Sequence, residues 1–356
     1  MKTSMNASMK TNARGFSLIE LLVVIAIIAL IIGIVIPALG AARDLAKKSA
    51  TSELITQIGS AAGMFKNDKR RTPGYFSARE MGSQENADRG MSGAENMMLD
   101  LAGGDAIRTS ADATHVEVGP KNAGRIYVDP DALGAGGSGS YFVAPPKYYV
   151  AQIEGTQQIA TIAGHAGAEG ARQLKDLVDA WGQPLLVWQA DEATITAVSA
   201  IDDFSSLEAD PVRPSRFYWN SNACFLKASS LGKKGQNQAD TANGSILGTQ
   251  RSNAERAASM GGLLGLPASV RAEDATASFN QMLPQTPRGG VVIQSAGTNG
   301  VYLGMKERGA RNANNVLYFG LNFKGMDNAP LTDSAGKALA VDLRSGFDDV
   351  IETAAN

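Results

Sequence analysis

The chain has 356 residues, which is enough for one large domain or two to three small ones. Its 33 basic and 35 acidic residues leave a net charge of −2, so it has no basic excess of the kind that wraps nucleic acid. One cysteine, Cys224, and two histidines exclude an intramolecular disulfide framework and a cysteine-rich zinc site, and leave little material for His-based catalysis.

An almost unbroken apolar run covers residues 16–39, behind fifteen residues that contain three basic residues and no acid. From Leu21 to Leu39 there is no charged residue. As an α-helix this stretch reaches about 28 Å, close to the ~30 Å hydrocarbon core of a bilayer. Three interpretations follow: a secretory signal peptide, a plain membrane anchor, or an anchor with a further function.

Glu20 helps to separate these interpretations. A signal peptide usually has an apolar region of 7–15 residues, and this run is longer and starts with an acid, although Ala38-Leu39-Gly40 has the small–x–small pattern of a cleavage site. An acid at the start of a membrane span costs up to ~3 kcal/mol if it lies deep. A plain anchor gains nothing from that cost, so Glu20 favours the third interpretation.

Residues 15–24 read GFSLIELLVV, which closely resembles the processing site of type IV prepilins and type II secretion pseudopilins. The resemblance extends over about 25 residues and includes Pro37, at a helix position where such pilins commonly carry proline. It implies a leader at residues 1–15 and cleavage between Gly15 and Phe16 by a membrane-embedded prepilin peptidase, followed by N-methylation of Phe16. Glu20 then becomes the fifth residue of the mature chain.

Cleavage changes the charge next to Glu20. The nitrogen of Phe16 is a neutral amide before the cut and an α-amine with a reference pKa near 8 after it, and methylation leaves that amine cationic. Glu20 of a neighbouring subunit can pair with this amine, which offsets the burial of the carboxylate. We therefore expect the cut to switch assembly on.

Gly33 and Pro37 predict a weak point in the apolar helix. Proline cannot donate to the carbonyl four residues earlier, which is that of Gly33, and glycine is itself a poor helix former. Residues 33–37 are expected to bend or to melt during packing. The alternative is a harmless kink of the sort that membrane helices tolerate.

Charge counting does not orient the span, since Arg43, Lys47 and Lys48 follow it as closely as basic residues precede it. The resemblance implies a single pass through the inner (cytoplasmic) membrane, with the leader in the cytoplasm and the remainder outside. It also implies the partners: a homo- or hetero-polymer of pilin-like subunits, the prepilin peptidase and an inner-membrane assembly platform. Nucleic acid is not an expected partner.

An amphipathic stalk helix is predicted over residues 40–68. Its apolar positions recur at spacings near three, four and seven, and they are Leu45, Ile55, Ile58, Ala62 and Phe65. The helix should end near Gly63–Asp68, before the basic run Lys69-Arg70-Arg71. That run could bind acidic lipid or nucleic acid, but a solvated turn after a helix is the commoner role of such a run.

The remainder, residues 69–356, is predicted to be an extracytoplasmic α+β head. Helices are expected at 92–101, where Ser92 and Glu95 match a capping box, and at 169–181. Strands, mostly joined by hairpins, are expected at 184–190, 194–201, 215–219, 290–296, 300–304 and 315–323. Residues 227–289 have weak periodicity and are interpreted as a long insertion. The expected fold is pilin-like: a long N-terminal helix packed on an antiparallel sheet with long loop insertions.

Three segments of the head are similar to major pseudopilins of type II secretion: residues 179–185 with a Trp-Gly-x-Pro turn, residues 295–300, and residues 347–351. The similarity implies a calcium ion held by the loop and by Asp348 and Asp349, and carboxylates with carbonyls do suit calcium. The chain departs from the pattern at Asn299, where an aspartate is usual, and by about forty extra residues before Asp348. An ordinary acidic turn near the C-terminus is the alternative.

No nucleophile–base–acid set and no Walker loop is visible in the sequence, and Cys224 is expected to be a buried small hydrophobe in a strand. We therefore do not expect an enzyme. The expected function is a structural subunit of a pseudopilus or type IV pilus-like filament, closest to type II secretion. Two alternatives stay open: a minor or tip subunit that binds a ligand, and a membrane-tethered enzyme or sensor.

Overall fold

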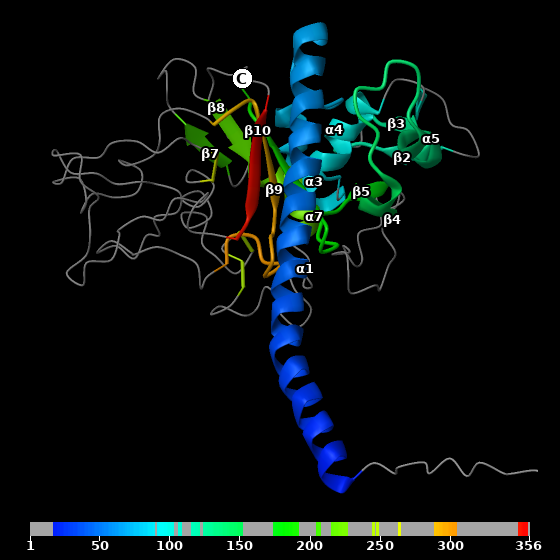
Figure 1. The fold of residues 1–356 in the computed structure, drawn as a ribbon. Helices are drawn as coiled ribbons and strands as arrows, with labels where there is room; N and C mark the ends of the chain where they lie inside the picture. The colour runs from blue at the N-terminus through cyan, green and yellow to red at the C-terminus, as the bar shows by residue number, and fades with distance from the viewer. Residues whose placement is uncertain are drawn as a thin grey trace, which may run out of the picture. The chain divides into compact units, whose positions relative to one another are not determined.

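A computed structural model describes residues 17–89, 91–102, 106–108, 115–121, 124–151, 174–191, 204–207, 215–226, 244–245, 247–248, 263–264, 288–304 and 348–354. The chain divides into two compact units, Met1–Ala46 and Lys47–Asn356. The first unit contributes the apolar part of the N-terminal helix, and the second contains the end of that helix together with the head (Figure 1).

The helices are α1 (Leu18–Lys69), α2 (Ala78–Met81), α3 (Gln84–Arg89), α4 (Gly93–Leu101), α5 (Pro130–Ala135) and α7 (Ala223–Leu226), with 3₁₀ turns η2 (Pro146–Tyr148) and η4 (Trp219–Asn222). The strands are β1 (Ile107–Arg108), β2 (Val116–Val118), β3 (Ile126–Val128), β4 (Tyr149–Ala151), β5 (Lys175–Leu177), β6 (Leu186–Gln189), β7 (Phe204–Leu207), β8 (Ser215–Tyr218), β9 (Val291–Ser295) and β10 (Val350–Ala354).

The N-terminal helix α1 is one continuous helix of 52 residues. Basic residues in its last turn, Lys66 and Lys69, suit the negative end of the helix dipole. The helix stops because Arg70 adopts a left-handed conformation with φ of 58°, which cannot continue a right-handed helix. The long helix expected from the sequence is therefore present, and it ends one residue later than expected.

The central sheet of the head has the strand order β10-β9-β6, and both pairings are antiparallel. Strands β6 and β9 are buried on both faces, which explains why they read as nearly continuous apolar runs. On one face, Val187, Val291 and Ile293 pack with the C-terminal part of α1 and with α4. The approach of α1 to β10 is close, because a Cβ added at Gly59 would lie 3.2 Å from Cγ of Glu352.

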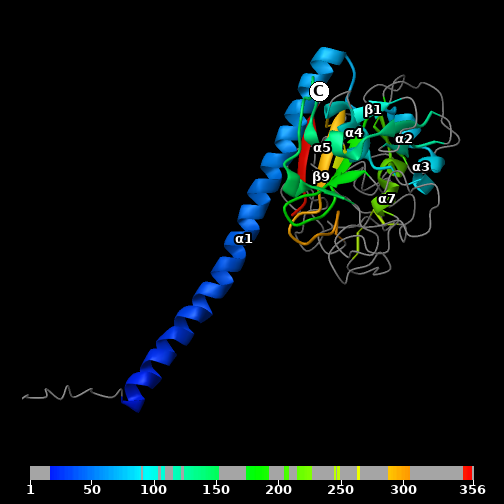
Figure 2. The ribbon, with the colours of Figure 1, turned by 90° about the vertical axis from the view of Figure 1, so that its right-hand side faces the viewer.

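The opposite face of the sheet packs against α7, η4 and β8. Leu186, Trp188 and Val292 point to this side and join a cluster that includes Trp219 and Phe225. Figure 2 shows α1 on one side of β9 and β10 and the helices α3 and α7 on the other side. This second unit is therefore a layered α+β structure in which helices cover both faces of an antiparallel sheet, as the α+β prediction requires.

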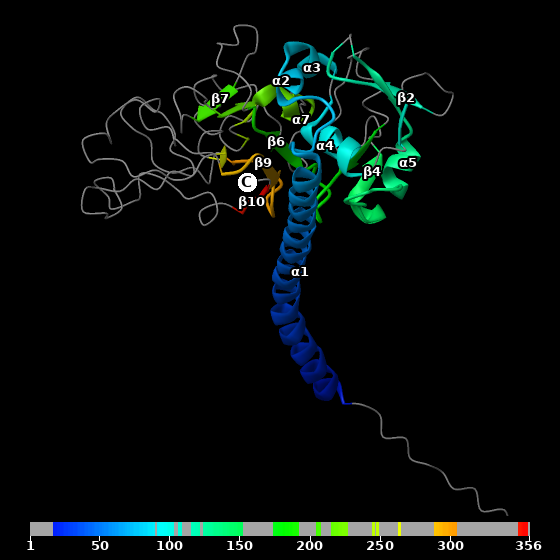
Figure 3. The ribbon, with the colours of Figure 1, turned by 90° about the horizontal axis from the view of Figure 1, so that it is seen from above.

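Smaller antiparallel sheets surround the central one. They are β1-β3-β2, β4-β5 and β7-β8. Figure 3 shows β2, β4 and α5 together beyond α4, away from β7. The expectation of one sheet joined mostly by hairpins is wrong for the central sheet, because β6 and β9 pair across about a hundred residues of intervening chain.

Several local predictions are confirmed. The helix expected at 92–101 is α4, and its capping box is present, with the Ser92 side chain accepting from the Glu95 N–H and the Glu95 side chain accepting from the Ser92 N–H. The strands expected at 184–190, 215–219 and 290–296 correspond to β6, β8 and β9. The expected strands 194–201 and 315–323 lie outside the described residues, as does most of 227–289.

Three local predictions are wrong. The helix expected at 169–181 is instead strand β5 followed by a turn where it is described, because β5 pairs with β4 and packs against α4. Residues 300–304 form a turn with an isolated bridge at Gly304. Cys224 is buried as expected but lies in α7, not in a strand.

Candidate functional site

The first candidate site is the apolar part of α1. Every large apolar side chain that it carries from Leu18 to Leu39 is exposed, between 43% at Val24 and 83% at Leu18. Within the described part of the chain, α1 is the one helix long and apolar enough to cross a membrane, and none of its most apolar window is buried. So much exposed apolar surface marks a membrane or protein interaction site.

Glu20 lies in the first turn of this helix and is held by Ser17. The Ser17 N–H donates to Oε2 of Glu20 at 2.8 Å, and the Glu20 N–H donates to Oγ of Ser17 at 3.3 Å. This reciprocal pair is a capping box, and it satisfies two N–H groups that a helix start leaves without partners. The spacing Ser-x-x-Glu is the same as in Ser92–Glu95, so the local sequence contains the signal for this helix start.

The cleavage residues Gly15 and Phe16 lie outside the described residues. Gly33 and Pro37 are described, and α1 stays α-helical through both of them. A Cβ added at Gly33 would meet no heavy atom of the described residues within 4 Å. The helix is thus unbroken at the predicted weak point in this single chain, and whether it melts during packing stays a prediction.

The second candidate site is formed by the carboxyl groups near the C-terminus. Oδ2 of Asp349 accepts from Nε2 of Gln294 at 2.7 Å and from the Leu303 N–H at 3.1 Å. Oδ2 of Asp348 accepts from the Asn299 N–H at 2.6 Å. The structure therefore brings the loop at 295–300 and the pair Asp348–Asp349 together, although they are about fifty residues apart in the sequence.

Gly297 is required at this junction. Its φ is 65°, and a Cβ at this position would lie 2.2 Å from the carbonyl oxygen of Asp348. Any other residue would therefore push the loop away from the C-terminal strand.

A third carboxyl group, Asp179, belongs to the turn before β6. Its Oδ1 accepts from the N–H groups of Trp181 at 2.8 Å and Gln183 at 2.9 Å, and its Oδ2 accepts from Oγ of Ser295 at 2.7 Å. Gly182 has a φ of 85°, which suits glycine in a tight turn. Asp179 thus connects the turn to the end of β9.

Burial dominates the electrostatics of these carboxyl groups. Burial, with smaller contributions from the charges of Asp348 and Asp179, raises the pKa of Asp349 to about 8 despite its two hydrogen bonds. Burial raises the pKa of Asp179 to about 6, although four hydrogen bonds oppose the shift. Both groups are therefore easier to protonate than ordinary aspartates.

The oxygen atoms of this site fit part of a calcium site. Oδ1 of Asp348 and Oδ1 of Asp349 are buried and accept no hydrogen bond from the residues that the structure describes. Hard oxygen atoms of this kind are the ligands that calcium prefers. In the parts of the chain that the structure describes, however, no three His, Cys, Asp or Glu side chains gather where they could hold a metal ion. Main-chain carbonyls or water would have to complete the coordination, and calcium binding stays a prediction.

Comparison with known proteins adds one match. Residues 10–36 match the family described as the prokaryotic N-terminal methylation motif. Neither the comparison with curated proteins nor that with solved structures gives a match. The match covers Glu20 and the start of the exposed apolar helix. The chain thus carries a prepilin-type cleavage and methylation motif, the signal of pilin-like subunits that a prepilin peptidase processes and that assemble into a membrane-associated filament.

Proposed function

We propose that this chain is a structural subunit of a type II secretion pseudopilus, without enzymatic activity of its own. It would be held in the inner membrane by one pass of α1, with the leader in the cytoplasm and the head outside. The observation that carries this proposal is the exposed apolar helix with an acid in its first turn, directly within the matched motif.

The proposed assembly follows from the exposure of this helix. Burying apolar surface stabilises by roughly 25 cal/mol per Å² in water, so the helix needs either lipid or neighbouring copies around it. In the membrane, lipid supplies these surroundings. In a filament, the helices of adjacent subunits supply them, and the apolar helices form the filament core.

Glu20 would set the register between subunits. In the single chain its carboxylate accepts from the Ser17 N–H, and its side chain is exposed. On assembly, the cationic N-terminus of Phe16 in an adjacent subunit provides a partner of opposite charge. A charged pair in apolar surroundings is tolerated only with good geometry, so one arrangement of neighbours is favoured.

The head supports the type II secretion branch of this proposal. The turn with Trp181 and Pro184 leads into β6, and the loop at 295–300 lies against Asp348 and the start of β10. These are the segments in which the sequence is similar to major pseudopilins. A type IV pilus is the neighbouring possibility, and the presence of a retraction ATPase gene nearby would favour it.

The first experiment tests processing. Mass spectrometry of the mature protein should find an N-methylated Phe16 at the N-terminus. Replacing Gly15 with a bulky residue should leave the full-length precursor in the membrane and abolish filaments. Processed filaments from the Gly15 variant, or a mature chain that begins elsewhere, would contradict the proposal.

The second experiment tests Glu20. Glu20→Ala should still be cleaved and inserted, but its filament yield should fall at least about tenfold, because the register between subunits is lost. Glu53→Ala is the matched control, since Glu53 is also an exposed acid on α1. Filaments are counted by electron microscopy after membrane levels have been equalised. Normal filaments from Glu20→Ala would show that Glu20 does not set the register between subunits.

A minor or tip subunit is the second candidate. The size of the chain favours it, because a repeating shaft subunit is usually more compact. Immunogold labelling of a tagged chain distinguishes the two: label along the fibres supports a shaft subunit, and label at the ends supports a tip subunit.

A further inference from the structure

The turn that follows α1 is held unusually firmly for an exposed segment. The guanidinium of Arg71 forms a bidentate ion pair with Asp100, at 2.6 and 2.9 Å, and also donates to the Gly74 carbonyl at 3.1 Å. The Gly74 N–H donates to the same carboxylate at 2.6 Å. Nε2 of Gln189, on β6, donates to the Thr72 hydroxyl at 2.8 Å. The turn is thus fixed to both α4 and β6.

Neighbouring side chains also pack closely around Gly74 in this turn and restrict its movement. A Cβ on Gly74, whose φ is 152°, would lie 2.7 Å from Oε1 of Gln189 and 2.9 Å from Nδ2 of Asn96. The Asn96 side chain accepts from the Phe76 N–H at 2.8 Å and donates to the Phe76 carbonyl at 2.9 Å. A turn that is already ordered loses little conformational entropy when a ligand binds it.

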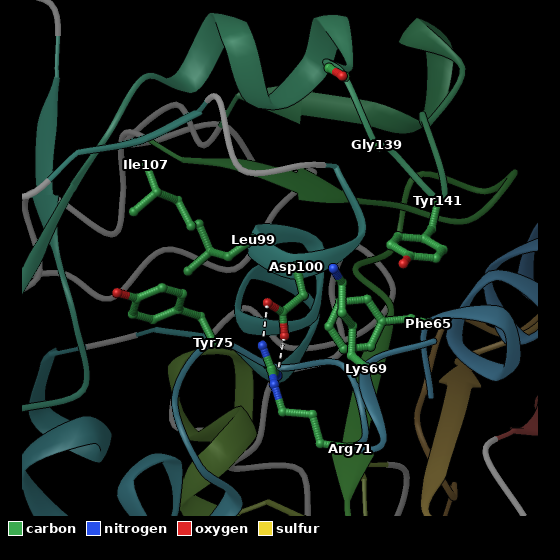
Figure 4. A pocket seen from close by; sticks show the side chains of 10 residues that line it. Phe65, Lys69, Arg71, Tyr75, Leu99, Asp100, Ile107, Gly139 and Tyr141 are labelled. Carbon is green, nitrogen blue, oxygen red and sulfur yellow. Dashed lines mark hydrogen bonds and ion pairs between the residues drawn. The ribbon is translucent and has the colours of Figure 1, made fainter. Parts of the chain in front are cut away.

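This turn separates two cavities, both within the second unit. The first, of about 470 Å³, is lined by Phe65, Tyr75, Leu99, Ile107, Tyr141 and polar residues that include Lys69. Figure 4 shows Tyr75, Leu99 and Ile107 on one side of the Arg71–Asp100 pair, with Phe65, Lys69 and Tyr141 on the other. The ring of Phe65 packs edge-on against Tyr141 and under the guanidinium of Arg71. The cavity is therefore apolar and aromatic, with charge at its margin.

The second cavity, of about 620 Å³, shares part of this turn, and its lining includes Lys66, Arg70, Thr72, Gln189 and Asp191. Arg71 and Tyr75 line both cavities. The Tyr75 side chain is 42% exposed, although it sits on a fixed turn. A rigid, exposed aromatic residue between two hollows is typical of a residue that dominates binding to a protein partner.

Two cations at these cavities have no acidic partner among the described residues: Lys69 at the first and Arg70 at the second. Arg71 is different, because Asp100 neutralises it. The first cavity thus combines apolar walls with the charge of Lys69, and the second, whose lining residues are mainly polar and include the buried Asp191, contributes the charge of Arg70; no acid of the described chain pairs with either cation. This combination selects a ligand with both apolar and anionic groups.

We propose that the turn at 69–75 is a docking site for an acidic peptide segment of a partner protein, which places apolar side chains beside Tyr75 and pairs its carboxylates with Lys69 and Arg70. Two separate cavities suit a chain that crosses the turn, whereas a small anion would fill neither. Nucleic acid is disfavoured, since its binding relies on many phosphate contacts and the chain is net acidic. Docking at this turn does not depend on the proposed filament function.

The test uses the full chain in nonionic detergent and three labelled peptides of equal length. The first alternates glutamate with phenylalanine, the second has alanine for each phenylalanine, and the third has lysine for each glutamate. Fluorescence anisotropy should show binding of the first peptide, which weakens as salt is added because part of the attraction is between exposed charges. The other two peptides should bind at least about tenfold more weakly.

Variants locate the binding to the turn. Tyr75→Ala should weaken binding of the first peptide about tenfold, and Lys69→Gln with Arg70→Gln should remove most of the salt dependence. Lys48→Gln, an exposed lysine of α1 outside both cavities, and Tyr127→Ala, on β3, are matched controls that should bind as the original chain does. Circular dichroism checks that each variant is folded.

Three results would overturn the inference: no binding of the first peptide at millimolar concentration, equal binding of the lysine peptide, or equal binding to the Tyr75 and Lys69/Arg70 variants. If the Tyr75 variant does not fold, the charge variant and the peptide series still decide the question. Normal filaments from the Gly15 and Glu20 variants would contradict the filament proposal but would leave this result unchanged, so the two proposals fail separately.

Discussion

At the scale of single residues, the buried carboxyl of Asp349 makes stability depend on pH. Its pKa is raised mainly by burial to about 8, against 3.8 for an ordinary aspartate. The native state keeps a proton that the unfolded chain loses near pH 4. The stability contributed by this group is thus complete below about pH 4 and is lost as the pH rises to about 8, at up to about 1.4 kcal/mol per pH unit. Asp179 acts in the same direction up to about pH 6.

We therefore expect Asp349→Asn to become more stable relative to the original chain as the pH rises from about 5 to about 8, because asparagine does not ionise. Urea unfolding of both full chains in detergent, at several pH values without calcium, measures the difference. Glu352→Gln, a partly exposed acid on β10, is the control and should follow the original chain. Parallel curves for Asp349→Asn and the original chain would show that Asp349 is ionised in the native state.

Bound calcium would offset the loss of stability that the buried carboxyl of Asp349 causes as the pH rises. A cation near Oδ1 of Asp348 and Oδ1 of Asp349 favours the ionised carboxylates, so adding calcium near pH 7.5 should raise the melting temperature of the original chain. Both Asp348→Asn and Asp349→Asn should lose this increase, and Glu352→Gln should keep it. A melting temperature that calcium and chelator leave unchanged would rule out the site.

At the scale of elements, the contact of α4 with β6 depends on a glycine. A Cβ at Gly93 would lie 2.2 Å from the carbonyl oxygen of Val187, and backbone cannot yield as a flexible side chain can. We expect Gly93→Ala to cost about 2–4 kcal/mol of unfolding free energy, because α4 must move away from the sheet. Denaturant unfolding measures this cost.

Gly63 provides the matched control for the same substitution. It lies inside α1, and a Cβ there would meet no atom of the described residues within 4 Å. Gly63→Ala should therefore stabilise by about 0.5–1 kcal/mol through helix propensity alone. Equal effects at Gly93 and Gly63 would contradict the close packing of α4 on β6.

The apolar part of α1 yields a second prediction at this scale. If residues 33–37 must melt during packing, replacing both Gly33 and Pro37 by alanine should stiffen the helix and lower the filament yield severalfold. Membrane insertion and cleavage should be unchanged. Val35→Leu, an apolar change in the same turn, is the control. Normal filaments from the double variant would favour the harmless kink.

At the scale of the whole molecule, the two compact units have opposite solvent requirements. The unit up to Ala46 exposes its large apolar side chains, whereas the buried α1 residues all lie after Lys47. We expect a chain of residues 47–356 to remain monomeric without detergent, while the full chain needs detergent. Size-exclusion chromatography checks this, and aggregation of the shorter chain would contradict the expectation.

Some of this organisation could be predicted from the sequence because its causes are local. An uncharged run with Glu20 at its start predicted the exposed helix and the processing motif, and Ser92 with Glu95 predicted the start of α4. The apolar runs around Val187 and Ile293 predicted strands, since such strands are covered on both faces.

Other features depended on tertiary contacts that no local pattern contains. Leu174, Leu177 and Val178 have helical spacing, yet pairing with β4 makes the described part of this segment a strand and a turn. From the sequence, the basic residues of the turn at 69–75 were interpreted as an ordinary solvated run. The ion pair of Arg71 with Asp100 on α4, which the sequence did not predict, shows that Arg71 is neutralised whereas Lys69 and Arg70 are not paired in this way. The sequence by itself thus determined the membrane helix and its processing signal, because charge and hydropathy act along the chain. The tertiary structure alone decided the burial of Asp179 and Asp349 and the two cavities, because segments far apart in the chain have to meet before burial and pairing can act on them.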